Sequence, residues 1–308
     1  MTAKEMQKYV VENIFQYLPK GKTWEVKAST NYQNNDKKVC TVSISCDGAV
    51  FKTIGVDMLC DLYNRGMDLE EIMNLFANFI VMELPNELND FAKNVFNFDF
   101  IKNRIFATVV HYACNINRLQ NLVYKKEEDL AFTYKILVES SDDNLATIPI
   151  QNNLLQHWNI TIDELHDLAI ENTKKMMPVR AYGLQEMTIK MLLGVFHIDN
   201  SDEYFDIKDV DWTEDLMYVI TNKLHQYGAF YMFDKDLLSE IAEKMKTNHL
   251  YVFPSSVHET IICNAEAIDP NDANQLVVDA NIRACSDDEV LSDHAYIFDL
   301  ESQELVSL

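Results

Sequence analysis

A short polar corner between two apolar runs holds the residue types most suited to chemistry in this chain. Pro254 is followed by Ser255 and Ser256, and His258 and Glu259 then open the second apolar run. A serine hydroxyl beside an imidazole can act as a nucleophile with its general base. On an extended strand His258 and Glu259 point to opposite faces, so they cannot act together on one substrate. The corner is therefore a candidate hydrolase-like site, built on Ser255 or Ser256 with His258.

A second pair, Asp293-His294, precedes the last apolar run, Ala295–Leu300. If that run is a strand beside Val257–Cys263, the pair would bring a carboxylate and an imidazole to His258. The alternative interpretation is structural, because Asp and His next to a strand often serve as a cap and a surface residue.

No metal or cofactor motif is visible in the chain. Ile262 stands where a zinc-protease helix needs its second histidine after His258, and no CxxC pair exists. Residues 202–215 lack the carboxylate spacing of a calcium loop. The seven glycines never cluster into a phosphate-binding loop. We therefore expect neither a metal ion nor a cofactor.

The cysteines and the apolar stretches indicate a cytoplasmic protein. Cys40 and Cys46 fall on one predicted strand, about 20 Å apart, which is too far for a disulfide. The other four cysteines are isolated in the sequence. No secretion signal is visible at Met1–Glu5, and no apolar stretch is long enough to span a bilayer.

The formal net charge of −23 is concentrated in two segments. Residues 201–215 hold seven acids against one lysine, and residues 265–308 hold eleven acids against one arginine. Such a field repels nucleic acid and membranes and attracts basic proteins. The alternative is a solvated face that only keeps the protein soluble. The acids that we predict to bind a partner lie in the first segment: Asp206, Asp209, Asp211 and Asp215.

The first two thirds of the chain alternate between helical and strand-like patterns. Thr2 with Glu5, and Thr161 with Glu164, have the spacing of capping boxes and predict helix starts. Alternating polarity predicts strands over residues 24–29 and 38–46. Residues 1–197 thus form a predicted helix-rich α+β region with a small antiparallel sheet. Residues 198–215 are a predicted acidic linker or insertion.

Residues 216–308 predict a compact ββαββαβ unit, which makes the fold class α+β with helices on one face of the sheet. Asp234 and Asp269-Pro270 are start signals for its two helices. The predicted strands share apolar or alternating patterns between turn signals: Met217–Thr221, Ala229–Phe233, Leu250–Phe253, Val257–Cys263 and Ala295–Leu300.

Several segments carry a family resemblance. They share unusual combinations of polar and aromatic residues: Glu128–Ala131, Gln156–Asn159, Glu164-Leu165, Asn172-Thr173, Val219–Asn222, Gly228-Ala229, Pro254–Glu259 and Glu289–His294. With them the chain resembles a family of cytosolic bacterial proteins, common in gut anaerobes, that has no assigned activity. The resemblance implies a cytoplasmic bacterial α+β protein, with a mobile element as one origin, and brings no catalytic residue or cofactor.

The residues leave two classes of function open. The first is a non-catalytic acidic binding or regulatory protein whose partner is a basic protein. In one form it inhibits a nucleic-acid-binding protein by occupying its channel. The second is a hydrolase-like enzyme that uses Ser255 or Ser256 with His258, and Asp293 or His294. Convergence of His258 and His294 in one pocket would favour the enzyme, whereas capping by backbone groups would favour binding.

Overall fold

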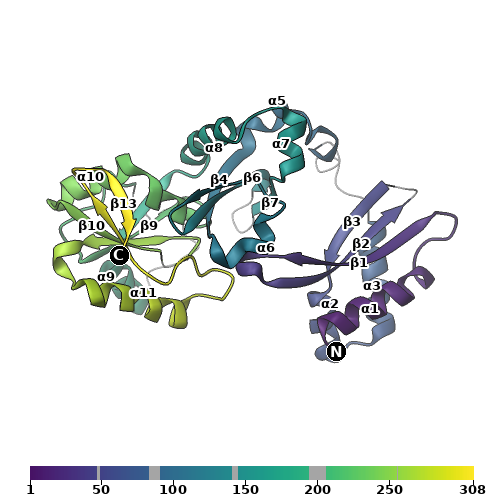
Figure 1. The fold of residues 1–308 in the computed structure, drawn as a ribbon. Coiled ribbons are helices and arrows are strands. Elements are labelled where there is room, and N and C mark those ends of the chain that lie inside the picture. Colours follow the sequence, from purple (N-terminus) through teal and green to yellow (C-terminus); the bar gives the residue numbers. More distant parts are fainter. Residues whose placement is uncertain (47–48, 83–90, 141–144, 194–205, 255) are drawn as a thin grey trace. The chain divides into compact units, whose positions relative to one another are not determined.

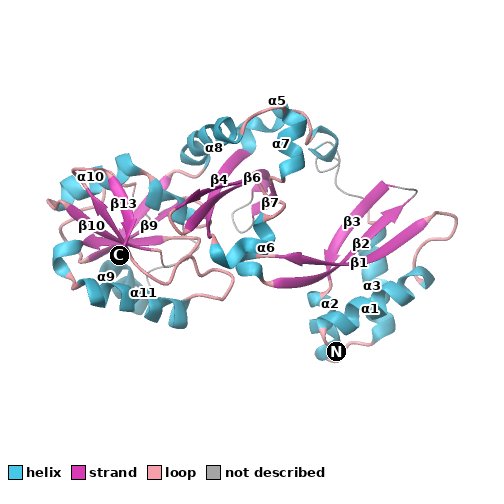
Figure 2. Ribbon diagram, in the orientation of Figure 1, coloured by secondary structure: helices cyan, strands magenta, loops and turns pink. Residues whose placement is uncertain are grey.

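A computed structural model describes residues 1–46, 49–82, 91–140, 145–193, 206–254 and 256–308 (Figures 1 and 2). The chain divides into two compact units, Met1–Asp90 and Phe91–Leu308. Both units combine helices with antiparallel sheets, so the predicted α+β class is confirmed. Within the described residues, no helix has the length and apolar character needed to cross a membrane.

The first unit packs helices on a three-stranded sheet. Its elements are α1 (Ala3–Asn13), β1 (Trp24–Tyr32), β2 (Lys38–Cys46), β3 (Ala49–Gly55), α2 (Asp57–Asn64) and α3 (Leu69–Val81), with single 3-10 turns at Ile14–Gln16 and Asn34–Asp36. The Thr2 hydroxyl accepts from the Glu5 amide while the Glu5 carboxylate accepts from the Thr2 amide, so the predicted capping box is confirmed. Met6 and Val10 of α1 lie in one buried cluster with Val42 and Ile44 of β2.

The second unit begins with a four-stranded sheet, in which β4, β6 and β5 lie in that order and β7 also pairs with β6. Its elements are α5 (Phe98–Ile101), β4 (Ile105–His111), α6 (Ile116–Leu119), β5 (Tyr124–Glu127), β6 (Leu130–Ser140), β7 (Leu145–Pro149), α7 (Asn152–Trp158) and α8 (Ile162–Met176). The Asn172 and Thr173 side chains tie α8 to β4, because Asn172 donates to the Ile105 carbonyl and Thr173 accepts from the Ala107 amide.

A six-stranded antiparallel sheet follows, in the order β13-β12-β10-β11-β9-β8. The elements that build and cover it are β8 (Val179–Gly183), α9 (Leu184–Leu192), β9 (Met217–Asn222), the 3-10 helix η6 (Gly228–Phe233), α10 (Lys235–Met245), β10 (His249–Phe253), β11 (Thr260–Asn264), α11 (Pro270–Ala284), β12 (Tyr296–Asp299) and β13 (Glu304–Ser307). As predicted, β10, β11 and β12 share one sheet, and the Asp269 carboxylate caps α11.

Three details of the predicted C-terminal unit are wrong. Ala229–Phe233 is a buried 3-10 helix instead of a strand, and β11 begins at Thr260 instead of Val257. Helices also cover both faces of the sheet (Figure 1). Leu238 of α10 packs in the cluster that holds Val252, whereas Val277 of α11 packs in the cluster that holds Tyr251. Both faces are apolar, because Leu250–Phe253 of β10, which alternate between the two faces, are all buried.

The predicted acidic linker lies within the second unit. Residues 198–205 fall outside the described part of the chain. In the described remainder, Ile207 and Trp212 are buried in the main core of the unit. These two side chains anchor residues 206–215 between β8 and β9, and so fix the position of the carboxylates around them.

Candidate functional site

An acidic pocket of about 370 Å³ lies between the start of α9 and residues 209–218. Its polar lining consists chiefly of carboxylates, and its apolar lining includes a side chain of α9. The acids are Glu186, Asp209, Asp211, Glu214 and Asp215, and the larger apolar and aromatic side chains are Ile189, Val210 and Tyr218. Three of the four predicted binding residues thus line one cavity. Asp206 does not line it, and lies 3.8 Å from the Arg180 guanidinium.

Asp215 in this pocket has a structural role. Its Oδ2 accepts hydrogen bonds from the Gln185 and Glu186 amides at 2.7 and 3.3 Å, and its Oδ1 accepts from the Leu216 amide. It therefore satisfies amides at the N-terminus of α9 from a distant position in the chain. Gly183 permits this approach, since a Cβ there would lie 2.6 Å from Asp215 Oδ2.

The remaining carboxylates of the pocket differ in whether they already have hydrogen-bond or ion-pair partners. Asp211 accepts from the Thr213 hydroxyl and amide, and these hydrogen bonds lower the pKa of its carboxyl. Glu186 pairs with Lys190 at 2.8 Å. The side chains of Asp209 and Glu214 are exposed, and within the described residues they make no hydrogen bond or ion pair. The pocket thus holds two carboxylates that are available to a cation.

The predicted hydrolase-like corner is held largely by backbone hydrogen bonds. Ser256 Oγ accepts from the His258 amide at 3.0 Å, and His258 Nδ1 accepts from the Tyr227 amide at 3.3 Å. Its Nε2 lies 3.6 Å from Glu289 Oε1. Burial lowers the pKa of His258, which favours the neutral imidazole. Ser255 lies outside the described residues. Ser256 Oγ thus accepts a hydrogen bond from the backbone amide of His258. Among the described residues, no hydrogen bond joins this hydroxyl to the imidazole ring of His258.

His294 lies in a different cluster, together with Asp293. Its Nδ1 is 3.0 Å from Asp293 Oδ1, and its Nε2 is 3.6 Å from Asp129 Oδ2. His111 Nε2 lies 3.7 Å from the same carboxylate oxygen. The Tyr296 hydroxyl donates to Asp129 Oδ1, and burial together with this carboxylate raises the pKa of the phenol. These residues come from the end of β4, the β5–β6 turn and the approach to β12.

The positions of protons in this cluster follow from its hydrogen bonds. The Cys114 amide donates to His111 Nδ1, so neutral His111 carries its proton on Nε2, toward Asp129. His294 faces Asp293 through Nδ1, so in its neutral form it presents a bare Nε2 to Asp129. Asp129 Oδ2 and His294 Nε2 are both buried without a hydrogen-bond partner. Two buried acceptor atoms therefore face each other across 3.6 Å.

The cluster lacks the geometry of a metal centre. Among the described residues, no group of three or more His, Cys, Asp or Glu side chains is arranged to hold a metal ion. The hydrogen bond at His111 Nδ1 gives a reason, because a histidine ligated through Nε2 normally donates from Nδ1.

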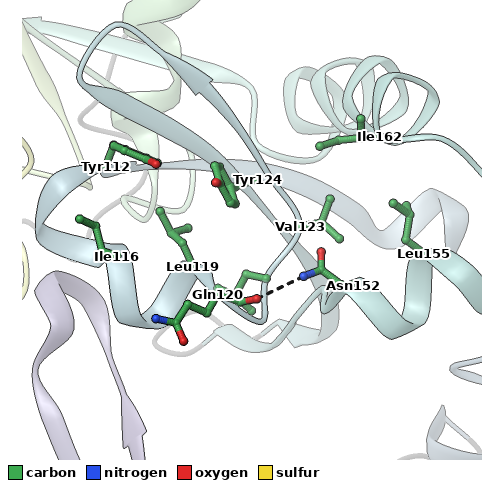
Figure 3. A pocket seen from close by; sticks show the side chains of 10 residues that line it. Tyr112, Ile116, Leu119, Gln120, Val123, Tyr124, Asn152, Leu155 and Ile162 are labelled. Atoms are coloured by element: carbon green, nitrogen blue, oxygen red, sulfur yellow. Dashed lines mark hydrogen bonds between the residues drawn. The ribbon is translucent and has the colours of Figure 1, made fainter.

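A second cavity, of about 350 Å³, lies beside α6, β5 and α7 (Figure 3). Its wall is mostly apolar, with Leu119, Val123 and Leu155 among the side chains that line it. The rings of Tyr112 and Tyr124 lie 5.9 Å apart at one end. No carboxylate, imidazole or ammonium group is among the described residues that line this cavity, so it suits binding better than acid–base chemistry.

Sequence reasoning missed several residues of these sites. His111, Asp129 and Tyr296 carry no local signal of their partnership, because Tyr296 and Asp129 are 167 positions apart. Asp129 does fall in one of the segments that carry the family resemblance. Glu186 belongs to α9, but nothing in the local sequence shows that this helix begins beside Asp215.

Comparison with known proteins places the chain in a family whose function is unknown. No curated protein and no solved structure matches it significantly. The profile of a family of unknown function, DUF5688, matches residues 3–300, and the protein therefore belongs to the DUF5688 family.

Proposed function

We propose that the protein binds a basic protein through the acidic pocket beside α9. The observation that supports this is the convergence of five carboxylates on one cavity, with Asp209 and Glu214 unpaired within the described residues. Like charges at short range raise the energy of the empty pocket, and a guanidinium or ammonium group lowers it. Ile189 and Val210 offer an apolar surface for the aliphatic stem of a lysine or arginine.

The charge of the whole chain supports the same function. A net charge of −23 accelerates encounter with a basic partner and disfavours nucleic acid. A partner whose own basic surface binds nucleic acid is the sharpest form of this proposal. In that form the protein acts as a non-catalytic inhibitor that competes with nucleic acid for its partner.

Reversal of the two unpaired charges tests the proposal. In the variant Asp209→Lys with Glu214→Lys, binding of a fluorescent penta-arginine peptide should weaken about tenfold or more, since two pocket charges change sign. Fluorescence anisotropy measures the affinity. The matched control is Glu301→Lys with Glu304→Lys, which makes the same charge change at exposed positions of the same unit. Asp215 is left intact because it caps α9.

The control variant shows whether the peptide binds in the pocket or is attracted only by the overall negative charge of the protein. Equal weakening in the two variants would mean that only the overall charge attracts the peptide, and the pocket would lose its role. Raising salt from about 50 to about 300 mM should weaken binding to the wild-type protein, because exposed charges are screened. The proposal would be refuted if the affinity for the peptide changed neither with salt nor with charge reversal.

A second candidate function is acid–base catalysis at His294 and Asp129. The specific observation is that Asp129 Oδ2 and His294 Nε2 are buried, unpartnered and 3.6 Å apart. Such a pair can take up and release a proton. In this candidate function the acid–base pair is His294 with Asp129, and the Ser256–His258 corner takes no part.

Hydrolysis of 4-nitrophenyl acetate distinguishes the two histidines. If His294 is the base, His294→Gln should reduce the protein-dependent rate about a hundredfold, the usual contribution of a positioned base. His258→Gln should leave the rate within about twofold, because its Nδ1 is occupied by the Tyr227 amide. The reverse pattern would restore the corner as the site, and no hydrolysis above buffer would remove ester hydrolysis as a function.

A further inference from the structure

A separate cavity of about 290 Å³ lies in the second unit, beside α8 and the start of α10. Its aromatic wall comes from Phe132 of β6 and from Phe230 and Phe233 of η6. The ring of Phe132 lies 4.9 Å from that of Phe233 and 5.0 Å from the imidazole of His166. Phe132 and Phe230 are almost fully buried, so the wall is a rigid part of the core.

His166 lines this cavity, and a hydrogen bond at one ring nitrogen indicates where its proton lies. Its Nδ1 is 2.9 Å from the hydroxyl of Tyr134. Burial raises the pKa of Tyr134, so the phenol keeps its proton, and within the described residues that hydroxyl has no other acceptor. The hydroxyl therefore donates to Nδ1, and the neutral imidazole carries its own proton on Nε2. Burial also lowers the pKa of His166, with Lys125 adding to the effect, which favours the neutral ring.

The charged groups inside the cavity are already paired with each other. Lys174 Nζ lies 2.8 Å from Asp234 Oδ2, and the Asp234 side chain is only 9% exposed. Asp234 also caps α10 by accepting from the Leu237 amide. Glu127, Lys235 and Asp236 line the mouth and are exposed. A charged ligand would find no unpaired side chain of opposite charge in the interior, and burying an unpaired charge costs free energy.

His166 and Lys174 lie on one face of α8 with Ile170 between them, because residues four apart stack along a helix. The cavity thus has a donor near one end, an ion pair near the other and apolar side chains between. Its volume is at the small end of the range for ligand pockets, which suits a single ring with one polar substituent.

We propose that this cavity binds an uncharged aromatic molecule bearing a carbonyl group, whose oxygen accepts a hydrogen bond from His166 Nε2. The phenylalanine wall packs against the ring of the ligand, since aromatic rings favour offset and edge-to-face contacts. Tyr134 is a positioning residue, because it fixes the tautomer that turns the N–H toward the ligand. This site is independent of the acidic pocket and of the His294 cluster.

Benzamide, benzoate and benzylammonium form a matched probe set, because they share a ring and differ in charge. Saturation-transfer NMR and calorimetric titration should show that benzamide binds about tenfold more tightly than either charged analogue, given the cost of an unpaired charge. His166→Phe should weaken benzamide about tenfold, the equivalent of one hydrogen bond. His166→Gln keeps an N–H donor and should retain part of the affinity.

The variant Tyr134→Phe distinguishes a positioning role of Tyr134 from a purely structural one, because a structural role alone would not change the affinity for benzamide in a folded variant. Without the phenol the imidazole can change tautomer, so benzamide should bind more weakly while the melting temperature identifies any loss of folding. Tighter binding of either charged probe than of benzamide would overturn the ligand class. Wild-type affinity in a folded His166→Phe variant would overturn the assigned donor, and absence of benzamide binding would overturn the site.

Discussion

Among the described glycines, Gly228 leaves the least room for an added Cβ. Its amide donates to the His258 carbonyl at 2.9 Å, and the Thr221 hydroxyl donates to the same oxygen at 3.0 Å. A Cβ at Gly228 would lie 2.4 Å from that carbonyl oxygen and 2.8 Å from Thr221 Cα. Both are backbone atoms, so relief requires movement of β9 or of the corner at His258.

Gly228→Ala should therefore destabilise the protein by about 3 kcal/mol or more, at the high end of overpacking. Urea denaturation followed by circular dichroism measures the loss. Gly55→Ala is the matched control, because its Cβ would meet Val39 Cγ1 at an ordinary 3.4 Å. Similar, small effects of the two substitutions would show that the corner yields easily.

Residue types alone do not reveal which polar groups are already used by the backbone. Asp215 and His258 were both plausible functional residues from sequence. In the structure Asp215 caps α9, and His258 Nδ1 accepts from the Tyr227 amide. Asp209, in the same acidic run as Asp215, has no hydrogen-bond or ion-pair partner for its carboxylate among the described residues. Only the position of distant amides separates these cases, and that information is absent from local sequence.

At the scale of helices and strands, the local signals were reliable. The capping boxes at Thr2 and Thr161 and the Asp269-Pro270 start all appear in the structure, because a cap involves residues within one turn. Ala229–Phe233 was misread as a strand. This run is almost entirely buried, so its apolar residues show no periodicity that would separate a 3-10 helix from a strand.

The pairing of elements could be predicted only where neighbouring elements follow each other in sequence. The hairpins β1–β2 and β10–β11 fall in this group. The apolar patterns predicted that β10, β11 and β12 share a sheet, with β11 considered as the neighbour of β12. In the structure β12 pairs with β10 instead. The approach of the β5–β6 turn to β12, which creates the Asp129–His294 pair, connects two sheets and has no sequence signal.

At the scale of the whole molecule, buried histidines oppose the effect of the large negative charge as pH falls. Burial lowers the pKa of His166, His225 and His258 below the ordinary value of 6.5. The unfolded chain therefore takes up protons below that pH that the folded chain does not hold, so acid favours unfolding. Glu259 acts in the opposite sense, since burial raises its pKa, but the histidines outnumber it.

We expect the free energy of unfolding to decrease as pH falls from about 7.5 to about 5.5, in about 0.5 M salt to screen surface repulsion. Denaturant titrations at several pH values measure the slope. His258→Gln should make the slope shallower, because it removes one of the three groups. Greater stability at the lower pH would show that relief of carboxylate repulsion dominates the titration of the histidines.

The bond between Tyr296 and Asp129 has a consequence for the order of events during synthesis. Asp129 leaves the ribosome long before Tyr296, whose hydroxyl donates to its carboxylate, and β10 is likewise made before its neighbour β12. Until β12 emerges, the Asp129 carboxylate in the β5–β6 turn lacks Tyr296 and His294, and one edge of β10 is unpaired. Such an edge is open to association with other chains. The second unit thus needs residues near the end of the chain to complete a sheet and a buried cluster that begin much earlier, and we expect chains that stop before β12 to aggregate.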